Sequence, residues 1–498
     1  MKTRTIRAAQ LICALAILPH AHAQNEEDAL RIGTLMPGGT GRSAGMANAF
    51  GAVGADPASI GINPAGFGLY RTSELSLTPL VEVNDAKATT YGTATGDTQT
   101  RFAIGNLALI LNTPSNGGDW RSGTFGVVMD RQQSHNRRVQ ANGTRVPSTF
   151  LESLAIDAEG IGNDAVHDAL PFTSGLAWET FAINPLDPDD SLGTSYLPAI
   201  PFGELTDQEH SMVSRGASTN TAFFYSGNYK DRLYLGMSVG ISAHRFKRTT
   251  THRETSLNTD LDLETATWTE ELNTTGNGID VKVGVIGRLT DRFRMGGSFH
   301  SPQWMQLSDA YVSDMVTTFR TTDVNGDSRY TSTSPDGSFS YRVHTPWRLV
   351  GSAAYVAGKN GLVSMDYEFH DPSKARFRTS DRLVSTYTYD VENEGIRAAF
   401  RPVHSLRVGT EWRFGNWYYR MGWALSSNPY VAEDGRRGDA WKNYAGGIGY
   451  RTDHVAVDLG TNLGLQQTRY YPYNAFLVNS TQVDRSDLRF LVTLSVRP

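Results

Sequence analysis

The feature that most constrains the fold is a strict alternation of apolar and polar residues in segments of about ten residues. Successive side chains of a β-strand point to opposite faces, so each such segment predicts a strand with one apolar and one polar face. The pattern is clear near the C-terminus, where the apolar set is Leu488, Phe490, Val492, Leu494 and Val496 and the polar set is Arg489, Thr493, Ser495 and Arg497. The same alternation recurs along the chain, which indicates an all-β protein.

The connections between these segments separate two architectures, a soluble sandwich and a transmembrane barrel. In a sandwich the polar face is the outer surface, whereas in an outer-membrane barrel it faces the lumen, and about 10 alternating residues cross the bilayer. Very short connections, such as 290–292, 359–361 and 452–453, alternate with long ones around 133–216, 247–277, 302–346 and 372–402. Outer-membrane barrels sort their connections in this way, with tight periplasmic turns and long external loops. We therefore predict a transmembrane antiparallel β-barrel.

The alternating segments predict about fourteen strands, and an even number places both termini on the periplasmic side. The predicted strands are 72–83, 100–112, 119–132, 217–227, 232–246, 278–289, 293–301, 347–357, 361–371, 403–414, 416–426, 440–451, 454–465 and 485–497. Two further segments, 310–320 and 338–345, are interpreted as arms of an external hairpin. As wall strands they would raise the number to sixteen, and this alternative stays open.

The N-terminus has the features of a secretory signal peptide, predicted over residues 1–23. Basic residues precede an apolar stretch, which ends before the small residues Ala21 and Ala23 at the cleavage site. The only cysteine, Cys13, lies within this segment, so the mature chain has no thiol for disulfides, metal ligation or catalysis. The formal charge of −5 becomes roughly −8 when three basic residues are removed with the signal. A nucleic-acid partner is disfavoured, because phosphate binding uses clustered Lys and Arg.

Residues 24–71 are too long for a tether and too few for a domain with its own core. They are rich in small residues and contain an Asn63-Pro64-Ala65-Gly66 turn. A barrel of fourteen strands is wide enough that side chains alone do not fill it. We therefore predict that residues 24–71 form a plug, or hatch, in the lumen, and that residues 72–498 form the barrel, with the largest external loop at 133–216.

The run GTGRSAGMANAFGAVGADPASIGINPAGFGLYRTSE resembles the hatch of the FadL-type outer-membrane family, the long-chain fatty-acid and aromatic-hydrocarbon transporters, in its Bacteroidetes-like branch. The matching residues are Gly41, Arg42, Met46, Ala49, Phe50, Asp56, Asn63, Pro64, Ala65 and Gly66. The resemblance implies a plugged fourteen-stranded barrel that takes up hydrophobic molecules without external energy. It also implies a lateral exit into the membrane at a kink in an early strand.

These expectations define a function and its partners. We expect an outer-membrane passive transporter for long-chain fatty acids or similar lipophilic compounds, in contact with its hydrophobic ligand and with outer-membrane lipid. No enzymatic activity, catalytic residue, cofactor or metal site is expected. Two other interpretations stay open. One is an accessory barrel of a protein secretion or surface-attachment system, with a protein partner. The other is a hemin receptor that uses a loop histidine among His135, His167 and His210.

Several residues have both a structural and a functional interpretation. Arg42 either pairs with a carboxylate of the lumen or meets an acid group of the ligand. Gly123 and Gly126 either bend the third strand or are lumen-facing glycines where the hatch packs. The Asn63-Pro64-Ala65 segment is a turn, a hinge or part of the ligand exit. One apolar set in the long loop forms either a first ligand pocket or the core of the loop itself: Leu151, Leu154, Ile156, Ile161, Leu170, Phe172, Leu176, Trp178 and Phe181.

Overall fold

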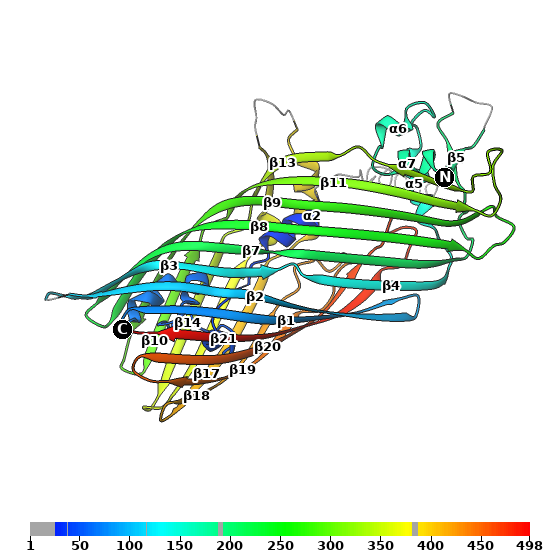
Figure 1. Ribbon diagram of the computed structural model, residues 1–498. Coiled ribbons are helices and arrows are strands. Elements are labelled where there is room, and N and C mark those ends of the chain that lie inside the picture. The colour runs from blue at the N-terminus through cyan, green and yellow to red at the C-terminus, as the bar shows by residue number, and fades with distance from the viewer. Residues whose placement is uncertain (1–24, 37, 116, 188–192, 381–386) are drawn as a thin grey trace, which may run out of the picture.

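The computed structural model describes residues 25–36, 38–115, 117–187, 193–380 and 387–498. The predicted signal peptide lies outside the described residues. Figure 1 shows a barrel of long, tilted strands, with the hatch inside one end and a group of small helices beyond the other.

Fourteen antiparallel strands form the closed wall, and they correspond one to one with the fourteen predicted from the sequence. Each pairs with the next along the chain, and β21 pairs with β1, where Leu75 lies opposite Val496. The wall strands in order are β1 (Glu74–Thr90), β2 (Thr93–Pro114), β3 (Trp120–Ser134), β7 (Thr206–Tyr229), β8 (Leu233–Ser256), β9 (Leu263–Arg288), β10 (Phe293–His300), β14 (Arg348–Ala357), β15 (Gly361–His370), β17 (Val403–Phe414), β18 (Trp417–Ser426), β19 (Trp441–Arg451), β20 (Val455–Tyr470) and β21 (Thr481–Val496).

The segments that would have given sixteen strands extend existing ones. β11 (Trp304–Phe319) follows β10, and both strands pair with β9. β13 (Gly337–His344) precedes β14, and these two strands pair with β11 and β10. The ladder is interrupted at 301–303 and 345–347, where Pro302 and Pro346 have no N–H to donate. The interpretation as an external hairpin is therefore confirmed, and β12 (Arg329–Thr333) and β16 (Arg376–Thr379) complete this external sheet.

The outer surface of the wall is apolar. On β8, Leu235, Met237 and Val239 are exposed, whereas the alternate residues Tyr234 and Ser238 are buried inside. A closed ladder satisfies the backbone groups, and an apolar outer face suits hydrocarbon, so the chain is a transmembrane barrel of the outer-membrane type.

No helix in the described part of the chain is long and apolar enough to cross a membrane.

All four predicted long loops are partly strand. β7, β8 and β9 contain 24, 24 and 26 residues, and β4 (Arg137–Val146) pairs with the external half of β7. Beyond the membrane the outward positions of β8 carry polar residues such as Thr249 and Arg253, so the hydropathy pattern ends while the ladder continues.

The described part of the remaining loop, residues 147–187 and 193–205, forms an external cap over β9 and β11. It contains α5 (Phe150–Ala158), α6 (Val166–Ala169), α7 (Ser174–Glu179), β5 (Ile183–Pro185) and β6 (Tyr196–Pro198). Leu151, Leu154 and Leu176 are fully buried there and belong to one cluster with Leu263 and Met315 of the wall. These apolar residues of the loop therefore belong to a structural core, whereas Phe181 is 49% exposed.

The hatch is built from short helices linked by turns: α2 (Glu26–Gly33), α3 (Gly41–Ala44), α4 (Ser59–Ile62) and the 3-10 helix η1 (Pro64–Leu69). The dark blue ribbons in Figure 1 place these segments inside the barrel. α2 lies farther toward the external side than the rest and packs on α8 (Asp390–Ala399), which follows η2 (Pro372–Lys374) and β16.

Candidate functional site

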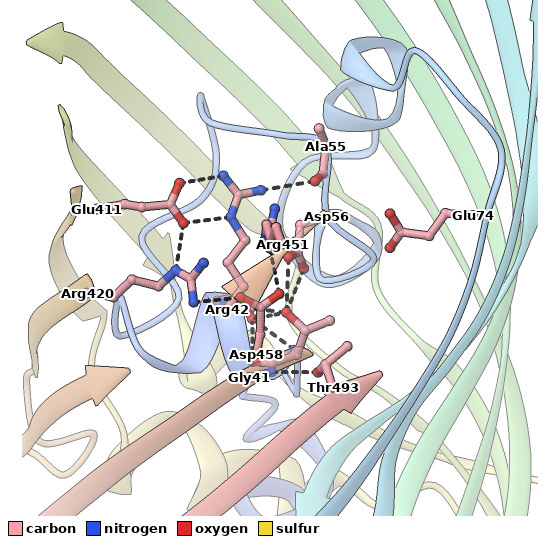
Figure 2. A network of polar contacts seen from close by, with 12 residues as sticks. Gly41, Arg42, Ala55, Asp56, Glu74, Glu411, Arg420, Arg451, Asp458 and Thr493 are labelled. Carbon is pink, nitrogen blue, oxygen red and sulfur yellow. Dashed lines mark hydrogen bonds and ion pairs between the residues drawn. The ribbon is translucent and has the colours of Figure 1, made fainter. Parts of the chain in front are cut away.

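Arg42 fixes the hatch to the wall. Its Nε and Nη2 donate to the two carboxylate oxygens of Glu411 on β17, at 2.9 and 2.8 Å, and its Nη1 donates to the carbonyl oxygen of Ala55, at 3.0 Å. Figure 2 shows Arg42 reaching from α3 into this cluster. Arg42 therefore pairs with a carboxylate of the lumen, as the first of its two interpretations states. Burial alone would lower the pKa of Arg42, but Glu411 raises it above its usual value.

The ion pair belongs to a buried network across four wall strands, β17 to β20. Arg420 Nε donates to Glu411 at 2.6 Å, its Nη1 lies 2.7 Å from Asp458, and Arg451 Nη2 donates to Asp458 at 2.6 Å. Glu411 and Asp458 are 5% and 2% exposed, so solvent does not screen these contacts. Removing one partner of such a buried pair costs about 3–5 kcal/mol, since a charge is left without compensation.

The other hatch residues of the matching motif also contact the wall. Gly41 N donates to Thr493 Oγ1 at 2.7 Å, and Phe50 N donates to Asp366 at 2.8 Å. Asn63 caps its own turn by accepting from Ala65 N, while its Nδ2 donates to the carbonyl oxygen of Val285 on β9. These contacts reach β21, β15 and β9, so the wall surrounds the hatch.

Glycines in the wall allow this close packing. A Cβ on Gly422 would lie 2.4 Å from the carbonyl carbon of Met46, and one on Gly236 would lie 2.4 Å from Pro64 and Ala65 backbone atoms. Gly66 packs within the hatch, where a Cβ would meet Ser59 Oγ at 2.5 Å. Any larger side chain at Gly422 or Gly236 would push the hatch from the wall.

The hydrogen-bonded ladder of the wall is interrupted between β2 and β3, and we call this interruption the opening. Their ladder runs from Pro114–Ser122 only to Asn106–Asp130, whereas β2 continues for thirteen residues beyond Asn106 paired on its other side with β1. Both strands carry an extra residue at this point: Gly105 has no partner in β1, and Gln132 has none in β7. β-Bulges of this kind end pairing and redirect side chains.

Asp130 is the last residue of β3 that pairs with β2, and it links the hatch to this opening through hydrogen bonds. Its carboxylate accepts from Gly38 N, Gly39 N and Asn106 Nδ2, at 3.3, 3.0 and 3.1 Å. The outer face beside the opening is apolar, because Phe102 and Ile104 of β2 are 73% and 46% exposed. The opening therefore lies within the membrane-facing part of the wall.

A pocket of about 370 Å³, a volume that includes open solvent, lies behind the opening. The lining of this pocket is apolar on one side and charged on the other. Leu80 and Leu491 form an apolar side, whereas Arg131, Arg489 and Glu82 form a charged side, with Arg489 Nε 3.4 Å from Glu82. Gly38 of the hatch and Gly105 of β2 line its edges.

A second cavity, of about 450 Å³ with open solvent included, lies between the hatch and the interrupted wall at Ser301 and Pro346. Leu35 and Met36 of the hatch line it, and Met36 N donates to the carbonyl oxygen of Gln132. Gln132 also lines this second cavity. The hatch chain thus lies beside both cavities where it meets β3.

Gly123 and Gly126 lie within the regular β2–β3 and β3–β7 ladders, opposite Thr113 and Ile110 on β2. The irregularities of β3 flank them, between Trp120 and Ser122 and between Arg131 and Gln133.

The three histidines considered as hemin ligands do not gather at one place. His135 and His210 are 6% and 5% exposed and face the lumen, whereas His167 is exposed on the cap and pairs with Glu179 at 2.9 Å. His135 bonds Ser218, and His210 bonds His252.

Sequence reasoning did not identify Gly105, Asp130 or Glu411. Glu411 and Asp130 occupy polar positions of alternating strands, as do many lumen-facing residues, and their role depends on which hatch atoms lie opposite. An isolated glycine in a strand indicates a bulge. Of these three residues, only Gly105 could therefore have been identified from the sequence.

No protein-family model matches the sequence, and the search of curated proteins gives no match. Solved structures do match over nearly the whole chain. The toluene transporter TodX of Pseudomonas putida is 12% identical, covers 91% of this chain and 96% of its own, and has a TM-score of 0.51. A FadL homologue of Pseudomonas aeruginosa is 13% identical, covers 93% of this chain and 98% of its own, and has a TM-score of 0.53. With its closed wall and N-terminal hatch, the chain therefore has the fold of the FadL-type outer-membrane transporters.

Proposed function

We propose that the protein is a passive outer-membrane transporter for hydrophobic small molecules, long-chain fatty acids or similar lipophilic compounds, and that its cargo leaves the lumen sideways between β2 and β3. The opening in the wall with a pocket behind it carries this proposal. The fold of proteins described as a toluene transporter and a FadL homologue supports a hydrophobic cargo.

The lateral route follows from the physical chemistry of the cargo. Apolar surface gains about 25 cal/mol per Å² when it leaves water, so a lipophilic molecule in the lumen is drawn toward hydrocarbon. The unpaired part of β2 places Phe102 and Ile104 beside the lipid and Gly105 beside the pocket. Exit at this place would take the cargo from the pocket to the membrane without a path through the hatch.

The lining of the pocket favours an amphiphile with an acidic head over a neutral hydrocarbon. Arg131 and Arg489 face one carboxylate, Glu82, so a ligand carboxylate would complete the charge balance. Leu80 and Leu491 would contact the apolar chain.

Binding of the acidic head is tested by titrating the purified protein with a fluorescent long-chain fatty acid. We expect a saturable signal, and Arg489→Gln should weaken binding about 10-fold or more, because a charge-assisted hydrogen bond contributes about 1.5–3 kcal/mol. Binding of a neutral aromatic such as toluene should be unchanged by this substitution. A titration without saturation would contradict the transporter proposal, whereas equal weakening for both ligands would contradict only the acidic-head assignment.

The route is tested by filling the pocket at the opening. Gly105→Trp should slow uptake of the labelled fatty acid into cells that lack other transporters, because the side chain occupies the pocket beside Leu80. Gly96→Trp is the matched control on the same strand, since a Cβ there has no neighbour within 4 Å. Equal uptake by both variants, at equal amounts of folded protein, would rule out this exit.

A further inference from the structure

Two arginines oppose each other on the outer surface of the external sheet. Arg342 of β13 lies directly opposite Arg378 of β16 in the antiparallel ladder. Both side chains are exposed, whereas the neighbouring Val343 and Phe377 point into the buried core. Like charges directly opposite each other destabilise a sheet, so this pair requires compensation.

Among the described residues, the hydrogen-bond partners of Arg342 and Arg376 are neutral groups. Arg342 Nε donates to the neutral amide oxygen of Gln306 at 2.9 Å. Arg376, two residues from Arg378 on the same face, uses Nη1 only for the carbonyl oxygens of Ser373 and Ala375. Within the described ranges, none of the three arginines forms an ion pair.

The arginine cluster, Arg342, Arg376 and Arg378, lies at a defined height above the membrane-facing surface. Trp304, 41% exposed, is opposite His344 in the β11–β13 ladder, and Gln306, opposite Arg342, follows two residues later. Two residues of a strand span about 7 Å. Exposed tryptophans mark the boundary between hydrocarbon and water, so the cluster lies at the level of lipid headgroups.

Aromatic and aliphatic side chains continue the surface below the cluster. Trp347 contacts Phe299 and Phe369, with ring centroids 6.4 and 5.7 Å apart, and Leu349 is 46% exposed beside them. Acyl chains can lie along this face while the polar head of the same lipid reaches the arginines. A soluble anion would use only the charged part of the surface.

We propose that the arginine cluster binds the phosphate group of a lipid in the external leaflet. Guanidinium groups match phosphate oxygens with paired hydrogen bonds, and a phosphate between Arg342 and Arg378 converts their repulsion into attraction. The lipid would thereby hold the short edge strand β16 against β13. This inference concerns the outer wall and is independent of what the lumen transports.

Native mass spectrometry of the purified protein in a zwitterionic detergent tests the proposal. The probes are a bisphosphorylated glucosamine lipid, its dephosphorylated form and inorganic phosphate. We expect the wild type to retain the phosphorylated lipid, and the variant carrying Arg342→Gln and Arg378→Gln to lose at least tenfold in retention. The control variant carries Arg292→Gln and Lys359→Gln at the opposite rim, where two short turns carry exposed cations, and it should retain lipid like the wild type.

Each outcome bears on the proposal. Selective loss in the arginine variant, with no binding of the dephosphorylated lipid, supports it. Equal retention by the arginine variant and the wild type would overturn it, as would equal retention of the dephosphorylated lipid. If millimolar inorganic phosphate displaces the lipid completely, the surface is a soluble-anion site and the lipid assignment is wrong. Heat-dependent gel mobility verifies that each variant is a folded barrel.

Discussion

At the scale of single residues, the hatch is held by a few buried polar groups that come from distant parts of the chain. Arg42 is separated from Glu411 by 369 positions in the sequence, and Gly41 from Thr493 by 452. A carboxylate of the lumen was one of the two partners that the sequence suggested for Arg42, but the sequence could not predict which carboxylate it would be. Such a choice depends on the register of the whole barrel, and no local pattern contains that information.

We expect Arg42→Ala to loosen the hatch strongly. The substitution leaves Glu411 with one cation fewer inside the barrel, and loss of a buried partner costs about 3–5 kcal/mol. Hydrogen exchange of the hatch amides, followed by mass spectrometry, should show faster exchange. Arg71→Ala is the control, because the Arg71–Asp231 pair also joins hatch and wall at 2.8 Å but is 56% and 42% exposed. Exposed pairs contribute about 1 kcal/mol or less, so similar effects of the two variants would contradict the role of burial.

Asp56 makes the hatch sensitive to pH. Burial raises the pKa of Asp56 to about 6, against the opposing effect of Arg42 and hydrogen bonds from Ala58 N and Thr40. The raised pKa means that the docked hatch favours the protonated acid. This stabilisation is complete below the ordinary pKa near 4 and is lost as the pH rises through about 6.

Hatch amides of the wild type should therefore exchange more slowly at pH 5 than at pH 7.5, after correction for intrinsic rates. In Asp56→Asn this difference should disappear, because the amide does not titrate. An equal pH dependence in both proteins would show that another group is responsible.

At the scale of elements, the wall strands could be predicted from the sequence and their external halves could not. Lipid requires apolar outward residues, so the part of each strand inside the membrane has a clear alternation, as in Leu233–Ile241 of β8. Beyond the membrane both faces meet water or the cap, and residues such as Thr249 and Thr251 do not distinguish strand from loop. The break between β2 and β3 was also missed, since both strands continue past it with ordinary sequences.

Close packing of hatch and wall gives a prediction at this scale. Gly422→Val should displace the hatch near Met46, because the added Cβ would lie 2.4–2.5 Å from backbone atoms that cannot rotate away. Gly351→Val is the matched control in a wall strand, where a Cβ has no neighbour within 4 Å. Limited proteolysis should cleave the hatch only in the Gly422 variant. Equal protection of both would show that the hatch can shift without loss of docking.

At the scale of the whole molecule, the closed wall and its apolar exterior decide where the protein resides. The sequence predicted this architecture, because alternation, loop sorting and an even strand number agree with one another. Positions of the cavities were not predictable, since they depend on how the hatch packs against all sides of the wall. Nor was the cap core assigned, because its apolar residues fit a ligand pocket equally well.

A charge on the outer face of the wall tests the membrane assignment. Val283 is 45% exposed near the middle of the apolar band on β9, and Val283→Arg should destabilise insertion by about 2–4 kcal/mol. Thr275→Arg, at an outward position farther along the same strand, should have little effect. Folding into vesicles, followed by heat-dependent gel mobility, measures both. Equal folding of the two variants would place the bilayer elsewhere on the barrel.

The wall strands differ in length, so the external end of the barrel is higher on one side than on the other. β9 has 26 residues and β18 has 10, whereas about 10 residues suffice to cross a bilayer. At about 3.3 Å per residue and a tilt near 40°, β9 rises on the order of 40 Å above the lipid. The side of the barrel at β9 therefore extends far above the lipid, and the side at β18 does not. Solutes at the cell surface approach over the lower side. Neighbouring membrane proteins packed against that side would obstruct their access.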